Sequence, residues 1–359
     1  MILPAALAAL LAVAGQAAAQ GFNFTVPRNG SNSTRPSVSN ADTSFTLLYQ
    51  NNLNLTDDPN HVGAILLDAM PPSAAAAACQ SIGEKLLPRS SLAAHYFDVL
   101  GMLSYHSWRR KAPRMQTYVI DGGTLSVLQG VQQMSYPMPT KNSTASGNAT
   151  SPSDASAPDQ GPMPVLCSQT GRGNQAANAA ATASNQIRVA SGGGVYVGFR
   201  NQKSFRFVGI PYAEPPRRFE YPVVFNATNR TIQATEYGSQ CVQNPGGGSE
   251  DCLFLNVWTP YIPKAGSADD LRPVLIWIHG GGLTGGSGSA LDTDGGQLAS
   301  REDIVTVTLN YRLSTLGFLA VPGTDVTGNY GIADQSLALQ VRVRSGASES
   351  AALTTGSGW

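Results

Sequence analysis

The feature that most constrains this chain of 359 residues is an apolar run that leads directly into glycine. Residues 273–282 read Pro-Val-Leu-Ile-Trp-Ile-His-Gly-Gly-Gly, and their β-branched and aromatic side chains predict a strand over 274–278. We expect this strand, like the run at 304–309, to be buried on both faces, as strands of parallel sheets are. It would deliver Gly281 and Gly282 to a position where bare backbone N–H groups can approach a ligand, because glycine has no Cβ.

Backbone N–H groups presented in this way suit a developing oxyanion. Two or three preorganised donors at about 3 Å would stabilise a tetrahedral intermediate by roughly 3–4 kcal/mol each. The alternative is a flexible glycine turn without a function. The preceding strand and His279 favour the oxyanion interpretation, because both belong to the context that such a motif requires.

The charge balance argues against a nucleic-acid partner. Charged residues make up 13% of the chain, with 23 basic and 23 acidic side chains. A nucleic-acid binder needs Lys and Arg clustered on one face, whereas the densest basic run here is Arg109-Arg110-Lys111. We interpret that run as a solvated helix end.

The N-terminus and the sequons predict a secreted glycoprotein. Residues 1–19 combine the apolar stretch Leu7–Val13 with Ala17-Ala18-Ala19 and predict a cleaved signal peptide, although an Ala-rich buried helix is the alternative. The stretch is shorter than the about 20 residues that span a bilayer, so we expect no transmembrane segment after cleavage. Eight Asn-x-Ser/Thr sequons support export: Asn23, Asn29, Asn32, Asn54, Asn142, Asn148, Asn226 and Asn229.

The four cysteines fit an oxidising compartment and allow three disulfide pairings. Cys241 and Cys252 flank the loop Pro245–Gly248, which can turn back on itself, and this pairing would leave Cys79 with Cys167. Spacing does not exclude buried free thiols.

Composition divides the chain into a small module, a linker and a second module. Residues 20–42 read as a flexible glycosylated segment and 43–136 as a small α+β module, with strands at 44–53, 62–67 and 115–120 and helices at 74–87 and 92–108. Leu, Phe, Met and Tyr at helical spacing over 92–108 predict a single apolar stripe. Residues 137–186 form a low-complexity linker with one strand around Cys167 that we expect to pair with the small module. The second module opens at Ile187, with a hairpin over 194–199 and 205–210.

The other histidines lack partners at ligand spacing, so we expect no metal site and no cofactor. These residues are His61, His95 and His106.

Four blocks in order resemble the type B carboxylesterase and cholinesterase family. The first is 207–216, Phe-Val-Gly-Ile-Pro-Tyr-Ala-Glu-Pro-Pro, followed by Arg218-Phe219, and the second is 250–260, Glu-Asp-Cys-Leu-Phe-Leu-Asn-Val-Trp-Thr-Pro. The third is the His-Gly-Gly-Gly block, and the fourth comprises 310–313, 317–319 and 328–335. The resemblance covers residues 187–340 and implies a partial carboxylesterase domain.

The resemblance implies an α/β fold, the N-terminal part of an α/β-hydrolase sheet, and hydrolysis of small-molecule or lipid carboxylic esters through a Ser, Glu or Asp, and His triad. Gly281 and Gly282 would supply two oxyanion-hole N–H groups, and His279 would help to hold their loop. The resemblance also implies a Cys241–Cys252 disulfide and an Arg218–Glu250 ion pair.

The triad itself is absent from the chain. No Gly-x-Ser-x-Gly pentapeptide occurs, and no histidine follows His279. Ser287 and Ser348 come nearest to the pattern. The resemblance stops near Gln340, and we interpret 341–359 as an aberrant tail of a C-terminally truncated esterase that is inactive as printed. A non-catalytic adhesion or recognition protein on the same scaffold, and a pseudogene product, remain the alternatives. We also expect the loss of later strands to expose the edges of strands 274–278 and 304–309.

Overall fold

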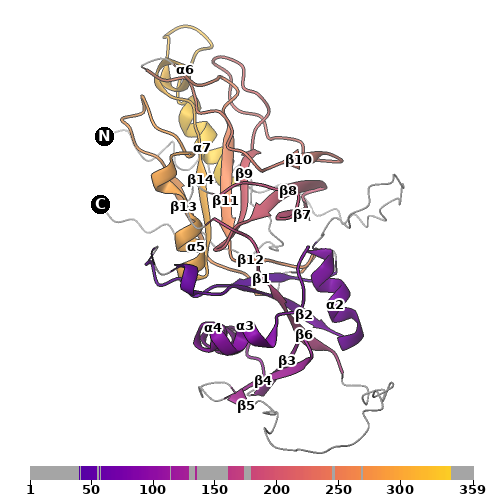
Figure 1. The fold of residues 1–359 in the computed structure, drawn as a ribbon. Coiled ribbons are helices and arrows are strands. Elements are labelled where there is room, and N and C mark those ends of the chain that lie inside the picture. The colour runs from indigo at the N-terminus through magenta and orange to yellow at the C-terminus, as the bar shows by residue number, and fades with distance from the viewer. Residues whose placement is uncertain are drawn as a thin grey trace, which may run out of the picture. The chain divides into compact units, whose positions relative to one another are not determined.

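A computed structural model describes residues 40–340 except 41, 55, 57, 114, 129–133, 136–160, 174–178, 245–246 and 268–269. The predicted signal peptide, the glycosylated segment up to residue 39, the tail 341–359 and most of the linker lie outside the described residues. Two sheets and six α-helices carry the described part of the chain (Figure 1). No helix within that part is both long and apolar enough to cross a membrane.

The first sheet has the strand order β12-β1-β2-β6-β3-β4-β5. Only its β3–β6 pair is parallel. The strands are β1 (Phe45–Leu48), β2 (Ala64–Met70), β3 (Met115–Ile120), β4 (Gly123–Leu128), β5 (Met134–Ser135), β6 (Met163–Ser168) and β12 (Tyr261–Ile262). The strand expected around Cys167 is therefore confirmed, and it lies between β2 and β3.

The second sheet has the order β10-β8-β9-β11-β14-β13, with β7 paired to β8. Its strands are β7 (Gln186–Ser191), β8 (Gly194–Arg200), β9 (Phe205–Pro211), β10 (Thr231–Gln233), β11 (Phe254–Thr259), β13 (Val274–Ile278) and β14 (Val305–Leu309). Strands β8 and β9 form the predicted antiparallel hairpin. The pairs β13–β14 and β10–β8 are parallel, which makes this a mixed sheet.

Proline and glycine set the ends of the first helix. Pro71 and Pro72 open α2, where the missing proline N–H costs nothing, and Gly83 follows its end with φ +72°. The helix predicted over 92–108 is two helices, because the backbone leaves the helical region at His95. The helical elements are η1 (Asp58–Asn60), α2 (Pro72–Ser81), α3 (Arg89–Ala94), α4 (Tyr96–Arg109), η3 (Leu291–Thr293), α5 (Gly296–Glu302), α6 (Ser314–Phe318) and α7 (Tyr330–Gln340).

Side chains of the first sheet alternate between two cores, as the two-residue period of a strand requires. In β2, Ala64 and Leu66 join the core that holds α3 and α4. Ile65 and Leu67 join the core that holds α2 and continues into the second sheet. The first sheet is thus covered on both faces, and one hydrophobic core runs through both sheets.

Contacts between residues far apart in sequence join the two sheets. Strand β12, which follows β11 in the chain, pairs with β1 (Phe45↔Ile262). Two buried ion pairs reach from the β8–β9 hairpin to the N-terminal part of the chain: Arg200–Glu84, and Lys203–Asp58 at 2.8 Å. A buried charge is costly unless it is paired, so each side chain in these two ion pairs depends on its partner.

The structure corrects three expectations from the sequence. Strand β13 is not buried on both faces, because Val274, Leu275 and Trp277 are 51%, 44% and 49% exposed. Among the described residues, β13 is an edge strand, whereas β14 is fully buried and paired on both sides. Of the two strands expected to have exposed edges, only β13 therefore has one. The basic run at 109–111 is not a simple solvated helix end, since its two arginines both form ion pairs with Asp270.

Candidate oxyanion site

The candidate site is the loop that follows β13. Strand β13 is held in register by parallel pairing with the buried β14, with Ile278 opposite Leu309. The chain then leaves the sheet at His279, and Gly281 and Gly282 take φ values of +114° and +62°. Such positive φ values are open to glycine at little cost, so the sequence permits a sharp turn directly at the strand end.

Gly281 is required by the close approach of its own loop. Its carbonyl oxygen accepts hydrogen bonds from the N–H groups of Thr284 (3.1 Å) and Gly285 (3.2 Å). A Cβ at position 281 would lie 2.1 Å from the Gly285 carbonyl oxygen, whereas a Cβ at Gly280 would meet nothing within 4 Å. Of these two glycines, only Gly281 is fixed by packing.

The N–H groups of Gly281 and Gly282 are free to bind a ligand. Among the described residues, no acceptor receives a hydrogen bond from either group. Both residues are exposed on the loop. An anion placed against this loop would therefore meet donors that need not break an existing hydrogen bond.

His279 lies at the base of this loop. Its ring stacks on Tyr311 with the centroids 4.4 Å apart, and its Nδ1 lies 2.9 Å from the Gly280 carbonyl oxygen. The Tyr311 hydroxyl donates to the His279 carbonyl oxygen at 3.0 Å. Burial lowers the pKa of His279 below its ordinary value, which favours the neutral form of the ring.

Three polar side chains that the sequence did not single out hold the far end of the loop. Gln243 accepts from the Gly286 N–H (2.8 Å) and donates to the Gly286 carbonyl (3.0 Å). Asn310 accepts from the Gly288 N–H at 2.8 Å, and Asn256 donates to the Gly288 carbonyl at 3.0 Å. Asn256 and Asn310 fall inside the family-like blocks, but nothing in the sequence pointed to Gln243.

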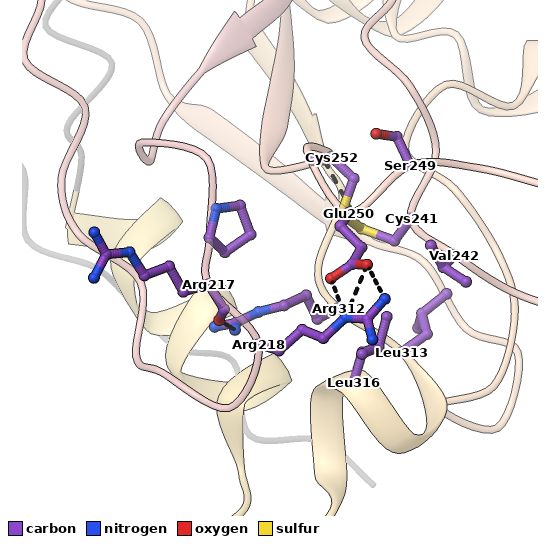
Figure 2. A pocket seen from close by; sticks show the side chains of 11 residues that line it. Arg217, Arg218, Cys241, Val242, Ser249, Glu250, Cys252, Arg312, Leu313 and Leu316 are labelled. Atoms are coloured by element: carbon purple, nitrogen blue, oxygen red, sulfur yellow. Dashed lines mark hydrogen bonds and ion pairs between the residues drawn. A yellow bond between two sulfur atoms is a disulfide. The ribbon is translucent and has the colours of Figure 1, made fainter.

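The cysteines form the pairs that the sequence favoured, Cys79–Cys167 and Cys241–Cys252. The second disulfide closes the loop that carries Gln243, and in this way it helps to position Gly286. Figure 2 shows Arg218 and Glu250 beside this disulfide, joined by hydrogen bonds of 2.9 Å from Arg218 Nε to both carboxylate oxygens. The Arg218 guanidinium lowers the pKa of Glu250 below its usual range.

A second, buried ion pair joins two parts of the fourth family-like block. Arg312 Nε and Nη2 donate to the two carboxylate oxygens of Asp334 at 2.8 and 2.7 Å, and the Arg312 backbone N–H donates at 3.0 Å. The exposed fractions of the two side chains are 5% and 0%. Arg312 also donates to the Glu220 carbonyl at 2.8 Å, which fixes the chain after β9.

The remaining predicted sites divide into described and undescribed positions. Three sequon asparagines, Asn54, Asn226 and Asn229, are exposed. Ser287 contacts Ser289 (2.6 Å) and Asn310, and no histidine donates to or accepts from it in the described part. The described ranges contain no group of three or more His, Cys, Asp or Glu that could hold a metal ion. Outside the described residues lie Ser348, Asn23, Asn29, Asn32, Asn142 and Asn148.

Comparison with known proteins identifies the part of the chain that carries this loop. Residues 184–343 match the Carboxylesterase family. This segment is a carboxylesterase-family segment. Its sheet and helices are consistent with the expected incomplete α/β-hydrolase fold, and we call residues 184–343 the esterase segment.

Individual relatives match a comparable share of the chain. Acetylcholinesterase-1 of Trittame loki is 44% identical over 151 residues, which is 38% of this chain and 27% of that protein. Cholinesterase of Mus musculus is 44% identical over 154 residues, 37% of this chain and 25% of that protein. Among solved structures, the Geobacillus stearothermophilus carboxylesterase EST55 is 40% identical, with a TM-score of 0.39, over 43% of this chain and 33% of its own. The chain thus spans about a quarter of the length of the curated relatives it matches.

Proposed function

We propose that the esterase segment is the oxyanion-binding part of a carboxylic ester hydrolase. The observation that carries the proposal is the pair of unengaged N–H groups at Gly281 and Gly282, presented by a loop that only glycine can form at position 281. In acyl transfer to a serine, these donors would stabilise the oxyanion of both tetrahedral intermediates. Small-molecule or lipid carboxylic esters are the substrate class.

His279 is a positioning residue in this proposal. Its ring packs against Tyr311, and its carbonyl accepts from the Tyr311 hydroxyl, so the start of the glycine loop is held on both sides. Gln243 and Asn310 hold the end of the same loop. A preorganised loop need not rearrange as charge develops, which is the source of oxyanion-hole catalysis.

The chain as printed should not turn over esters, because it contains neither a serine elbow nor a histidine after His279. In a serine hydrolase studied by mutation, loss of the nucleophile alone lowers kcat about 10⁶-fold. The sequons and the two disulfides support a secreted glycoprotein as its setting.

A chimera tests the proposal. Residues 40–340 would replace the matched quarter of mouse cholinesterase, and hydrolysis of 4-nitrophenyl acetate would be measured. We expect turnover in the chimera and none in the printed chain. Gly281→Ala should lower kcat by about 10²–10³, while Gly280→Ala, where a Cβ meets nothing within 4 Å, should change it little.

Two results would overturn the proposal. One is a folded chimera without turnover. The other is equal turnover for the Gly281→Ala and Gly280→Ala chimeras, because the loop geometry would then have no role in the reaction.

A further inference from the structure

The outward face of α3 and α4 is apolar and aromatic. The exposed positions include Ala94 at the end of α3 and, at helical spacing along α4, Phe97, Gly101, Tyr105 and Trp108. Phe97 and Trp108 are both 67% exposed, and Tyr105 is 40% exposed. We call these five residues the aromatic stripe.

The aromatic stripe is not the apolar face that anchors α4 in the protein. That inward face consists of Val99, Leu100 and Leu103, which are buried against the first sheet. The sequence predicted one apolar stripe over 92–108, whereas the structure shows two faces, one buried and one exposed. A surface helix normally turns charged side chains outward, and large apolar side chains gathered on an exposed face mark an interaction site.

The acidic side chains beside the aromatic stripe are paired. Asp303 accepts a hydrogen bond from the Tyr105 hydroxyl at 3.0 Å, and its carboxylate is paired with Arg272 Nε at 2.6 Å and Arg109 Nε at 3.3 Å. Asp98, the acidic residue of α4, is 13% exposed and lies 3.1 Å from His61 Nδ1. Both ends of the stripe are basic. Arg89 precedes it and Lys111 follows it, both exposed, and neither has a carboxylate partner in the described part of the chain.

A basic cavity of about 750 Å³ continues the stripe at the C-terminal end of α4. Two carboxylates and four cations line it. Asp270 engages Arg109 and Arg110, and Asp68 accepts hydrogen bonds from Ser44. Lys111 and Lys264, which also line it, form no ion pair with any described residue. The cavity therefore adds two unpaired cations at the C-terminal end of α4.

We propose that the aromatic stripe and the basic cavity dock the protein on an anionic lipid surface. Trp and Phe side chains enter the boundary between headgroups and acyl chains, while Lys and Arg beside them attract acidic headgroups. A second copy of this chain fits the face less well. Pairing two stripes in either direction would bring their basic ends together, and like charges repel.

Vesicle sedimentation of the full chain tests the proposal. The vesicles would be pure phosphatidylcholine, or phosphatidylcholine with phosphatidylserine. We expect binding to the phosphatidylserine vesicles, with an affinity that falls as salt is raised. Phe97→Ser with Trp108→Ser should weaken binding about tenfold or more, and Lys111→Glu with Lys264→Glu by at least about fivefold per lysine.

Val223→Ser with Val224→Ser is the matched control, because these two side chains of the esterase segment are 66% and 56% exposed. The control should bind like the parent chain, and urea unfolding would show that all variants are equally folded. Equal binding to both vesicle types, no binding to either, or equal loss in the control would overturn the proposal. A concentration-dependent dimer that Phe97→Ser with Trp108→Ser abolishes would also overturn it, and would assign the stripe to a second copy.

Discussion

Asp334→Asn should destabilise the protein by about 3–5 kcal/mol, the cost of breaking a buried ion pair. The carboxylate accepts three hydrogen bonds from Arg312, at 2.7, 2.8 and 3.0 Å, and both side chains are almost fully buried. An asparagine retains one acceptor oxygen and turns an NH₂ group toward the guanidinium. The cation is then buried without a counter-charge, and the loss is a large share of the 5–15 kcal/mol that holds a typical domain together.

Urea unfolding followed by fluorescence measures this cost, and the structure supplies a matched control. Arg218–Glu250 is also an arginine–carboxylate pair, but its side chains are 66% and 37% exposed. Glu250→Gln should therefore shift the unfolding midpoint far less, because water and salt screen an exposed pair. Adding Arg312→Met to Asp334→Asn should recover part of the loss by removing the stranded charge. Equal shifts for Asp334→Asn and Glu250→Gln would refute the reasoning.

Three further predictions concern the loop and the cross-links. Gly281→Ala should lower the free energy of unfolding by about 1–3 kcal/mol through strain, while Gly280→Ala stays within about 0.5 kcal/mol; similar urea midpoints for the two would contradict the geometry. The pKa of His279 is lower in the folded than in the unfolded chain, so as the pH falls the unfolded chain binds the proton first. The free energy of unfolding should therefore rise with pH up to about 6.5. His279→Gln should flatten this slope when the free energy of unfolding is measured at successive pH values. Removing the Cys79–Cys167 disulfide with two alanines should lower the free energy of unfolding by about 4–5 kcal/mol, because it closes a loop of 88 residues. The same change at Cys241–Cys252, which closes a loop of 11 residues, should cost about 3 kcal/mol. A reversed order of thermal midpoints would contradict this prediction.

Local sequence predicted those elements whose signal is local. The hairpin of β8 and β9, the strand β6 around Cys167 and the buried β14 follow from alternation, apolar runs and turn residues. The helix boundaries were less accurate. His95 interrupts the helix predicted over 92–108, and no glycine or proline marks the break.

Burial depends on what packs against an element, and this limited the prediction for β13 and α4. The apolar run of β13 reads like an interior strand, yet its exposure is set by its place at the edge of the described sheet. Phe97 and Trp108 face outward, yet side chains of the same kind also form the core-facing stripe of a helix. A sequence states that a side chain is apolar, but the neighbouring elements decide whether it meets protein or solvent.

The sequence by itself predicted the chemistry of the candidate site: a strand that leads into His279 and three glycines, residues without a Cβ beside which a ligand can approach the backbone, and a loop that can bring Cys241 to Cys252. These are properties of the covalent chain and its local backbone. Only the tertiary structure decided that Gln243 and Asn310 hold the ends of that loop, that Asp334 reaches Arg312, and that residues before position 130 share a core and buried ion pairs with the esterase segment. Such contacts join residues that are distant in sequence, and their strength comes from exclusion of water in the folded core, which no local pattern encodes.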